Sequence, residues 1–172
     1  MKFPSSDPLK LDVQALAEQG GSLAGAWPLA ELPRLADSVL QGTPVNWRLQ
    51  GELRQLPGGA PEIWLGLAAE TEVALTCQRC LEPVSEHLAV DRWLRFVAGG
   101  EEAAAALDAE MEDDVLALRP RMNARELVED ELLLALPLVP RHAVCPQSLP
   151  AGADTAAPAT QRPFEALASL KR

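Results

Sequence analysis

The residues of this sequence whose types and spacing offer chemistry are three cysteines and two histidines. Cys77 and Cys80 form a C-x-x-C pair, and His142 and Cys145 form an H-x-x-C pair further along the chain. Four such side chains can bind a structural zinc ion tetrahedrally and so tie two parts of the chain together. The C-x-x-C pair alone could also cycle as a disulfide, or simply shape a turn. Spacing does not decide among these three interpretations.

The surroundings of the C-x-x-C pair bear on the redox interpretation. A catalytic dithiol usually begins a helix, whose N-terminus lowers the pKa of the thiol. Here a strand-like run precedes Cys77, and another follows Pro83. Leu81 stands after the second cysteine, where a zinc knuckle usually has glycine. The sequence therefore disfavours a thiol oxidoreductase and favours structural cysteines that shape the turn, with no cofactor. A structural zinc site is the second hypothesis.

Alternation of apolar and polar residues predicts the strands that would position the C-x-x-C pair. Residues 45–53, 63–77 and 84–96 each alternate with a period of two. Arg92 falls on the apolar side of the last run, so its two faces are imperfectly separated. The short connection between the last two runs favours antiparallel pairing, with the C-x-x-C pair at the tip of a hairpin.

Helical spacing of apolar residues predicts the elements that would pack on these strands. Amphipathic helices are expected near residues 31–40 and 123–136, the second with Asn123 as its cap, and a short helix near 11–18. We therefore predict an α+β domain with an antiparallel sheet or partly open barrel over roughly residues 45–97.

Composition shifts along the chain predict its organisation. Residues 1–145 are expected to form a single domain that carries a flexible acidic loop at 99–114. Residues 146–162 are rich in Pro, Ala, Ser, Thr and Gly, which is typical of a flexible linker. The last segment, 163–172, is expected to be a C-terminal amphipathic peptide, since its apolar residues recur at a spacing of three: Phe164, Leu167 and Leu170.

Charge narrows the classes of partner. The 172 residues carry a formal net charge of −10, from 25 acidic and 15 basic residues. Residues 99–114 contain many acids and no basic residue. This balance argues against a general nucleic-acid-binding protein but leaves room for a local basic face. The acidic segment would be a solvated loop, or it would mimic a polyanion or dock a basic partner.

Neither motifs nor hydropathy indicate an enzyme or a membrane protein. Dinucleotide-binding, P-loop, zinc-protease and nucleophile-elbow motifs are absent from the sequence. No run approaches the roughly 18 apolar residues of a membrane span, and the first residues do not resemble a secretory signal. We expect a cytoplasmic protein that is not an enzyme, with neither a membrane nor a small molecule as partner.

Three stretches of the chain, in this order, carry a family signature. They are Cys77-Gln78-Arg79-Cys80 between strands, Glu-Leu-Val-Glu-Asp-Glu-Leu-Leu-Leu-Ala-Leu-Pro-Leu-Val-Pro at 126–140, and Pro-Phe-Glu-Ala-Leu-Ala-Ser-Leu-Lys at 163–171. Together they resemble the bacterial YceD family, the large ribosomal RNA subunit accumulation proteins. The resemblance covers most of the chain, and its second stretch is long and specific.

The resemblance implies a non-enzymatic ribosome biogenesis factor that supports the synthesis, processing or stability of 23S ribosomal RNA and large-subunit assembly. Some relatives carry further cysteines after the second stretch, which implies a metal site; this chain has His142 and Cys145 there. The implied partners are ribosomal RNA or a basic large-subunit ribosomal protein. A zinc-stabilised protein-interaction module and a thiol oxidoreductase remain as alternatives.

Two hypotheses describe how such an acidic chain would act. It would contact RNA through a local basic and aromatic face, or it would hold a basic ribosomal protein through the acidic segment and the start of the helix at 123. The charge map favours the second. The carboxylates at that helix start also fit an ordinary capped helix. The candidate contact residues are Arg48, Arg79, Arg92, Trp93, Arg95, Glu126, Glu129 and Asp130.

Overall fold

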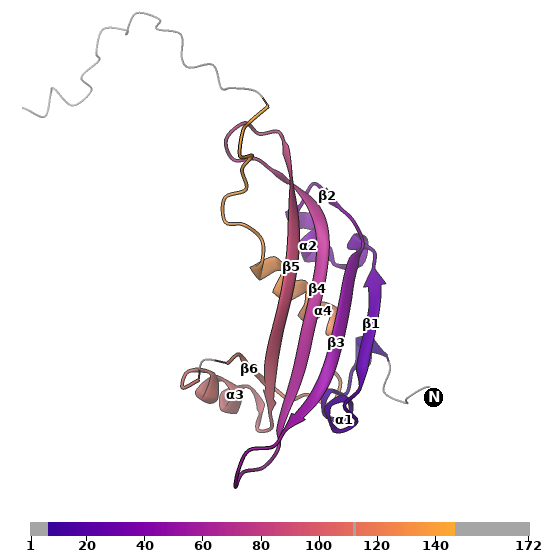
Figure 1. Cartoon of the computed structure of the whole chain (residues 1–172), viewed down its shortest axis with the longest axis vertical. Coiled ribbons are helices and arrows are strands. Elements are labelled where there is room, and N and C mark those ends of the chain that lie inside the picture. The colour runs from indigo at the N-terminus through magenta and orange to yellow at the C-terminus, as the bar shows by residue number, and fades with distance from the viewer. Residues whose placement is uncertain (1–6, 112, 147–172) are drawn as a thin grey trace, which may run out of the picture.

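The structure of the chain, a computed structural model, describes residues 7–111 and 113–146 (Figure 1). The expected linker after Pro146 and the C-terminal peptide at 163–172 lie outside these residues. Within them, no helix combines the length and the apolar composition needed to cross a membrane.

A long antiparallel hairpin organises the fold. Its two strands, β4 and β5, pair from Ile63 opposite Phe96 to Thr76 opposite Pro83. They belong to a six-stranded open sheet with the order β1-β3-β4-β5-β6, in which β2 pairs with β4. The strands are β1 (Ser22–Trp27), β2 (Gln41–Gly42), β3 (Val45–Arg54), β4 (Glu62–Thr76), β5 (Pro83–Val97) and β6 (Val115–Ala117).

One face of the sheet is covered by helices. In Figure 1, α4 crosses behind the long strands, between α1 and α2. Strand residues of one parity, including Leu49, Leu65, Leu67 and Leu94, are fully buried against this layer. The helical elements are η1 (Pro8–Lys10), α1 (Val13–Glu18), η2 (Leu29–Glu31), α2 (Pro33–Ser38), α3 (Gly100–Asp108) and α4 (Ala124–Leu134).

The predicted α+β class with an open sheet is confirmed, with two differences. The sheet is mixed, because β6 runs parallel to β5 after α3 has carried the chain back along the sheet. Strand β1 was not predicted, since Ala and Gly have low strand propensity. It is fixed instead by packing: Trp27 stacks on Trp47 of β3 with ring centroids 4.3 Å apart.

The expectation of an acidic loop at 99–114 is wrong over most of its length, because residues 100–108 form α3. Four successive alanines, residues 103–106, have the highest helix propensity, and Glu101 and Glu102 lie in the first turn, where negative charge is favourable. The helix is held by a small apolar cluster in which Ala104 packs with Val115 and Ala117 of β6.

Candidate metal centre and neighbouring surfaces

The tip of the long hairpin brings together the four candidate ligands. Cys77 follows β4, Cys80 lies in the turn to β5, and His142 and Cys145 lie on the chain after α4. Their ligand atoms all lie within 4.8 Å of one another. The Cys77 and Cys145 Sγ atoms are 3.9 Å apart, and Cys80 Sγ is 3.4 Å from His142 Nδ1.

These separations fit a tetrahedral metal site. Zinc–sulfur bonds of about 2.3 Å and zinc–nitrogen bonds of about 2.0 Å place neighbouring ligands roughly 3.5–3.8 Å apart. A disulfide would need about 2.05 Å between sulfurs, and all three cysteines are free. Three thiolates and one imidazole are a common ligand set for closed zinc sites. The donor set and the spacing therefore both suit a structural zinc ion.

The turn reaches this geometry without glycine. Leu81 has a φ of 66°, in the left-handed region that a knuckle turn requires and that glycine adopts most easily. Its side chain points into solvent, so the cost is confined to the backbone. The turn closes by two backbone hydrogen bonds, from Leu81 N to Cys77 O at 2.9 Å and from Cys77 N to Glu82 O at 3.0 Å. The absence of glycine therefore does not exclude a knuckle.

Contacts around the ligands fix their orientation. His142 Nε2 donates to the carbonyl oxygen of Pro83 at 3.0 Å, which leaves Nδ1 with a free lone pair directed at the sulfurs. Metal-binding histidines are usually held by such a second hydrogen bond. In addition, Gln78 N donates to Pro140 O at 2.9 Å. The chain after α4 is thus attached to the hairpin by one backbone bond and one side-chain bond, whether or not a metal is bound.

The thiols differ in acidity. Burial acts to raise the pKa of Cys77, but hydrogen bonds from backbone groups of Cys80, His142 and Arg79 outweigh it and lower this pKa to about 5. Burial, together with the neighbouring sulfurs of Cys80 and Cys77, raises the pKa of Cys145 to about 11. The first thiolate forms readily, and its negative charge opposes ionisation of the next thiol. A bound dication would stabilise the thiolates together.

The low pKa of Cys77 would also suit a redox nucleophile, but its position does not. The side chain is completely buried, whereas thiols that react with other proteins are accessible. The turn is followed by β5 and not by a helix. Burial among three other donor atoms favours a metal ligand over an exchanging thiol.

The basic candidates do not form one face. The sheet register places Arg48, Trp93 and Arg95 on the uncovered face of the sheet and Arg92 on the helix-covered side. Arg92 pairs with Asp114 and approaches Glu131 of α4 to 3.6 Å. Arg95 lies 2.6 Å from Glu62.

Trp93 is also engaged by its neighbours. The guanidinium of Arg54 lies over the rings of both Trp64 and Trp93, 4.1 and 4.6 Å from their centroids. A Cβ atom at Gly66 would come within 3.0 Å of the Trp93 ring, so the cross-strand glycine makes room for it. A nucleic-acid base could stack on this side only by displacing Arg54.

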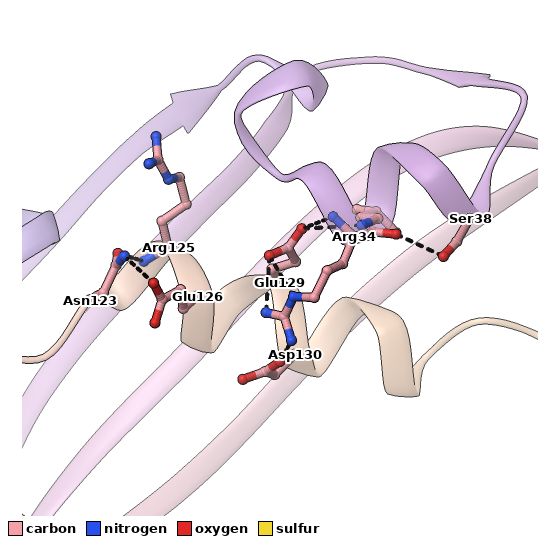
Figure 2. A network of polar contacts seen from close by, with 8 residues as sticks. Arg34, Ser38, Asn123, Arg125, Glu126, Glu129 and Asp130 are labelled. Atoms are coloured by element: carbon pink, nitrogen blue, oxygen red, sulfur yellow. Dashed lines mark hydrogen bonds and ion pairs between the residues drawn. The ribbon is translucent and has the colours of Figure 1, made fainter.

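The acidic candidates on α4 have a structural role that needs Arg34, a residue with no signal in the sequence. Figure 2 shows Glu129 pointing at the start of α2, where it accepts from the backbone N–H groups of Arg34 at 2.7 Å and Leu35 at 3.1 Å. The Arg34 guanidinium also binds Glu129, at 2.9 Å, and Asp130. Glu129 and Asp130 thus join α2 to α4 and are not free for a partner.

Glu126 completes the cap of α4. It accepts from the side-chain amide of Asn123 at 2.8 Å, and Asn123 accepts from Arg125 N at 3.2 Å. The predicted cap therefore lies where the sequence placed it.

Sequence reasoning also missed a hollow of about 430 Å³ on the uncovered face of the sheet. Small side chains make the hollow, and the only available signal was their recurrence at alternate strand positions. Its lining includes Ala24, Asn46, Arg48, Ala68, Ala89 and Asp91.

Fold and site together define an α+β protein whose longest hairpin ends in a candidate Cys3His metal centre. A family model described as "Large ribosomal RNA subunit accumulation protein YceD" matches residues 65–171, and the chain belongs to this family. The resemblance seen in the sequence is confirmed. The match covers most of β4, the C-x-x-C turn, α4 and the H-x-x-C pair. No solved structure matches the chain.

Proposed function

We propose that this chain is a cytoplasmic, non-enzymatic ribosome biogenesis factor that supports accumulation of large-subunit ribosomal RNA by holding a basic ribosomal protein. The observation that carries the proposal is the family match over residues 65–171. The family description names the large-subunit RNA, and the choice of partner rests on the charges that the fold leaves available.

Unpaired charge favours a basic protein over RNA as the direct partner. We call residues 99–114 the acidic end. There, Glu102, Glu110 and Asp113 are exposed, and none of them pairs with another described residue. By contrast, Arg92 and Arg95 are neutralised by carboxylates. Free acids beside neutralised bases give a surface that attracts cations and repels phosphates.

We propose further that Cys77, Cys80, His142 and Cys145 hold a structural zinc ion. All four tetrahedral positions would be filled by protein atoms, which is typical of structural and not of catalytic sites. The two histidines of the chain are both engaged, since His87 bonds Glu72 at 2.8 Å and His142 bonds Pro83. These contacts support a role in binding and not in acid–base catalysis.

Direct contact with RNA is the second candidate. Arg48 and Arg79 are exposed, and neither pairs with a described carboxylate. Arg48 borders the hollow on the uncovered face. The two arginines lie at separate places, on β3 and in the C-x-x-C turn, and would supply a small part of the contacts of a typical RNA site.

Retention of the full chain on immobilised basic large-subunit proteins, compared with 23S ribosomal RNA fragments over a salt series, separates the two candidates. We expect retention on the proteins that weakens with salt. Substituting Glu102→Gln, Glu110→Gln and Asp113→Asn together should weaken it about tenfold.

The matched control is Asp37→Asn, Glu70→Gln and Glu82→Gln, which removes the same charge from exposed positions elsewhere and should leave retention nearly unchanged. Retention on RNA but not on the proteins would reverse the choice of partner. Retention on neither at low salt would reject both candidates.

A further inference from the structure

The chain between the end of α4 and the metal cluster presents apolar side chains to solvent. Leu134, Leu138, Val139 and Val144 are 74%, 101%, 53% and 84% exposed, and Leu81 in the facing turn is 75% exposed. We call these five residues the exit surface. Single exposed apolar residues are ordinary, whereas several gathered together mark a binding surface. Four of these five lie close in sequence, between Leu134 and Val144.

The exit surface is held in place and is not a loose loop. Pro140 accepts a hydrogen bond from Gln78 N, and His142 donates to Pro83. In Figure 1 this stretch runs from α4 back to the tip of the hairpin. The backbone of this stretch is thus held before anything binds, so docking would cost little backbone freedom.

We propose that residues 163–172 of the same chain dock on the exit surface. This segment has the apolar residues Phe164, Leu167 and Leu170 at a regular spacing of three, which offers one apolar side to an apolar surface. The family match continues to residue 171, so the segment belongs to the same unit of sequence as the hairpin and α4.

The tether makes this occupant favourable. The intervening residues 147–162 begin three positions after Val144. A chain of about 16 residues spans at most roughly 55 Å, with a typical end-to-end distance of about 22 Å if it is flexible. A short tether of this kind gives an effective concentration in the millimolar range. Weak intrinsic affinity is then sufficient for docking.

Charge argues against a second copy of the chain as the occupant. The segment 163–172 carries one acid, Glu165, against two bases, Lys171 and Arg172, so it is not acidic like the chain as a whole. A second copy of the chain is disfavoured, because each copy carries a net charge of −10. The inference stands apart from the ribosomal role and from metal binding.

Methyl NMR of the full chain tests the docking. Substituting Phe164→Ser, Leu167→Ser and Leu170→Ser should move the methyl signals of Leu134, Leu138 and Val144. These methyl groups would lose contact with the aromatic ring of Phe164 and with the two leucines. The core signals of Leu49 and Leu65 should stay in place. Adding a synthetic peptide of residues 163–172 to this variant should return the signals to their original positions, with a Kd of about 0.1–1 mM.

Two controls keep the result specific. Glu165→Gln, Ser169→Ala and Lys171→Gln change the same segment but retain its apolar residues, and should leave the signals unmoved. Leu138→Ser alters a fully exposed side chain, which the fold does not need, and should weaken binding of the peptide about tenfold relative to Leu56→Ser, in the loop between β3 and β4 at the other end of the long strands.

Identical exit-surface signals in the original chain and the triple serine variant would overturn the proposal. So would signals that change on dilution together with the mass of a dimer, since a second copy would then be the occupant. The proposal would also be overturned if the methyl signals of the exit surface moved as far in the polar control as in the serine variant.

Discussion

The two ends of the β4–β5 hairpin are stabilised by different chemistry. At the tip, a turn and a distant segment meet through three sulfurs and one imidazole. At the acidic end, α3 and β6 are held by a small apolar cluster and by the pairing of Arg92 with Asp114. With the proposed zinc ion, the tip would depend on the ionisation of its thiols and on the metal, whereas the acidic end depends on ordinary burial and leaves acids free. We infer that the tip serves structure and the acidic end serves binding.

The largest predicted effect is at the tip. Cys77→Ala removes one of four ligands, so the zinc content should fall from about one per chain to below about a tenth. The free energy of unfolding should fall by about 4 kcal/mol or more, the stabilisation lost with a tightly bound ligand. Metal analysis and chemical denaturation measure both.

The control at the tip is Gln78→Ala, which shortens an exposed side chain in the same turn and keeps the backbone bond to Pro140. It should retain zinc and stability. Full zinc content in Cys77→Ala would contradict the ligand assignment.

The second effect lies between the two ends, in the helix layer. Glu129→Gln removes a buried charge that accepts from two backbone N–H groups and pairs with Arg34, and should cost about 2–4 kcal/mol. Asp130→Asn, at a half-exposed pair, should cost less than about 1 kcal/mol. Equal costs in denaturation experiments would show that burial does not set the strength of this contact.

At the acidic end, Val115→Ala should have a moderate effect. It empties part of the cluster with Ala104 and Ala117 and should cost about 1–2 kcal/mol in chemical denaturation. Zinc content should be unchanged. Val144→Ala, at an exposed position near the tip, should stay within about 0.5 kcal/mol. Loss of zinc in Val115→Ala would show that the two ends are coupled.

The smallest effect is a gain in stability. Burial raises the pKa of Glu131, Arg92 counteracts this, and Asp114 and Asp130 add to it. Because the folded chain holds this proton more tightly than the unfolded chain, the folded state loses stability as pH rises through the folded pKa. Glu131→Gln does not titrate and should be more stable by about 1 kcal/mol at pH 7.

The gain in stability from Glu131→Gln should disappear near pH 4, about the ordinary pKa of a glutamate, because the original side chain is protonated there in the folded state. Denaturation at several pH values measures it. A variant that is less stable at pH 7 would mean that the contact with Arg92 at 3.6 Å outweighs the cost of burial.

Elements with strong periodicity could be predicted from sequence, and those made of small residues could not. The alternation in β3, β4 and β5 and the Asn123 cap of α4 predicted their positions closely. Strand β1 is rich in Ala and Gly, which have low strand propensity, so its packing partners and not its own residues define it. The run of alanines at 103–106 was a helix signal, but the many acidic residues around it indicated a loop.

The candidate site was predictable in its residues but not in its surroundings. Cysteine and histidine spacing singled out the four candidate ligands, because few residue types bind zinc. Spacing alone did not favour a metal site over a turn without one. The bond from Arg34 to Glu129 joins residues 95 positions apart, and no local pattern encodes it. The sequence placed Arg92 on the apolar side of its strand. The register of the sheet shows that this side is the face opposite to that of Arg48.

The central claim is that Cys77, Cys80, His142 and Cys145 bind one metal ion. X-ray absorption at the zinc edge of the full chain, purified without chelator, tests it most directly. We predict about one zinc per chain, with three sulfurs at about 2.3 Å and one nitrogen at about 2.0 Å. Less than about a tenth of an equivalent of zinc, or a ligand shell without sulfur, would contradict the account.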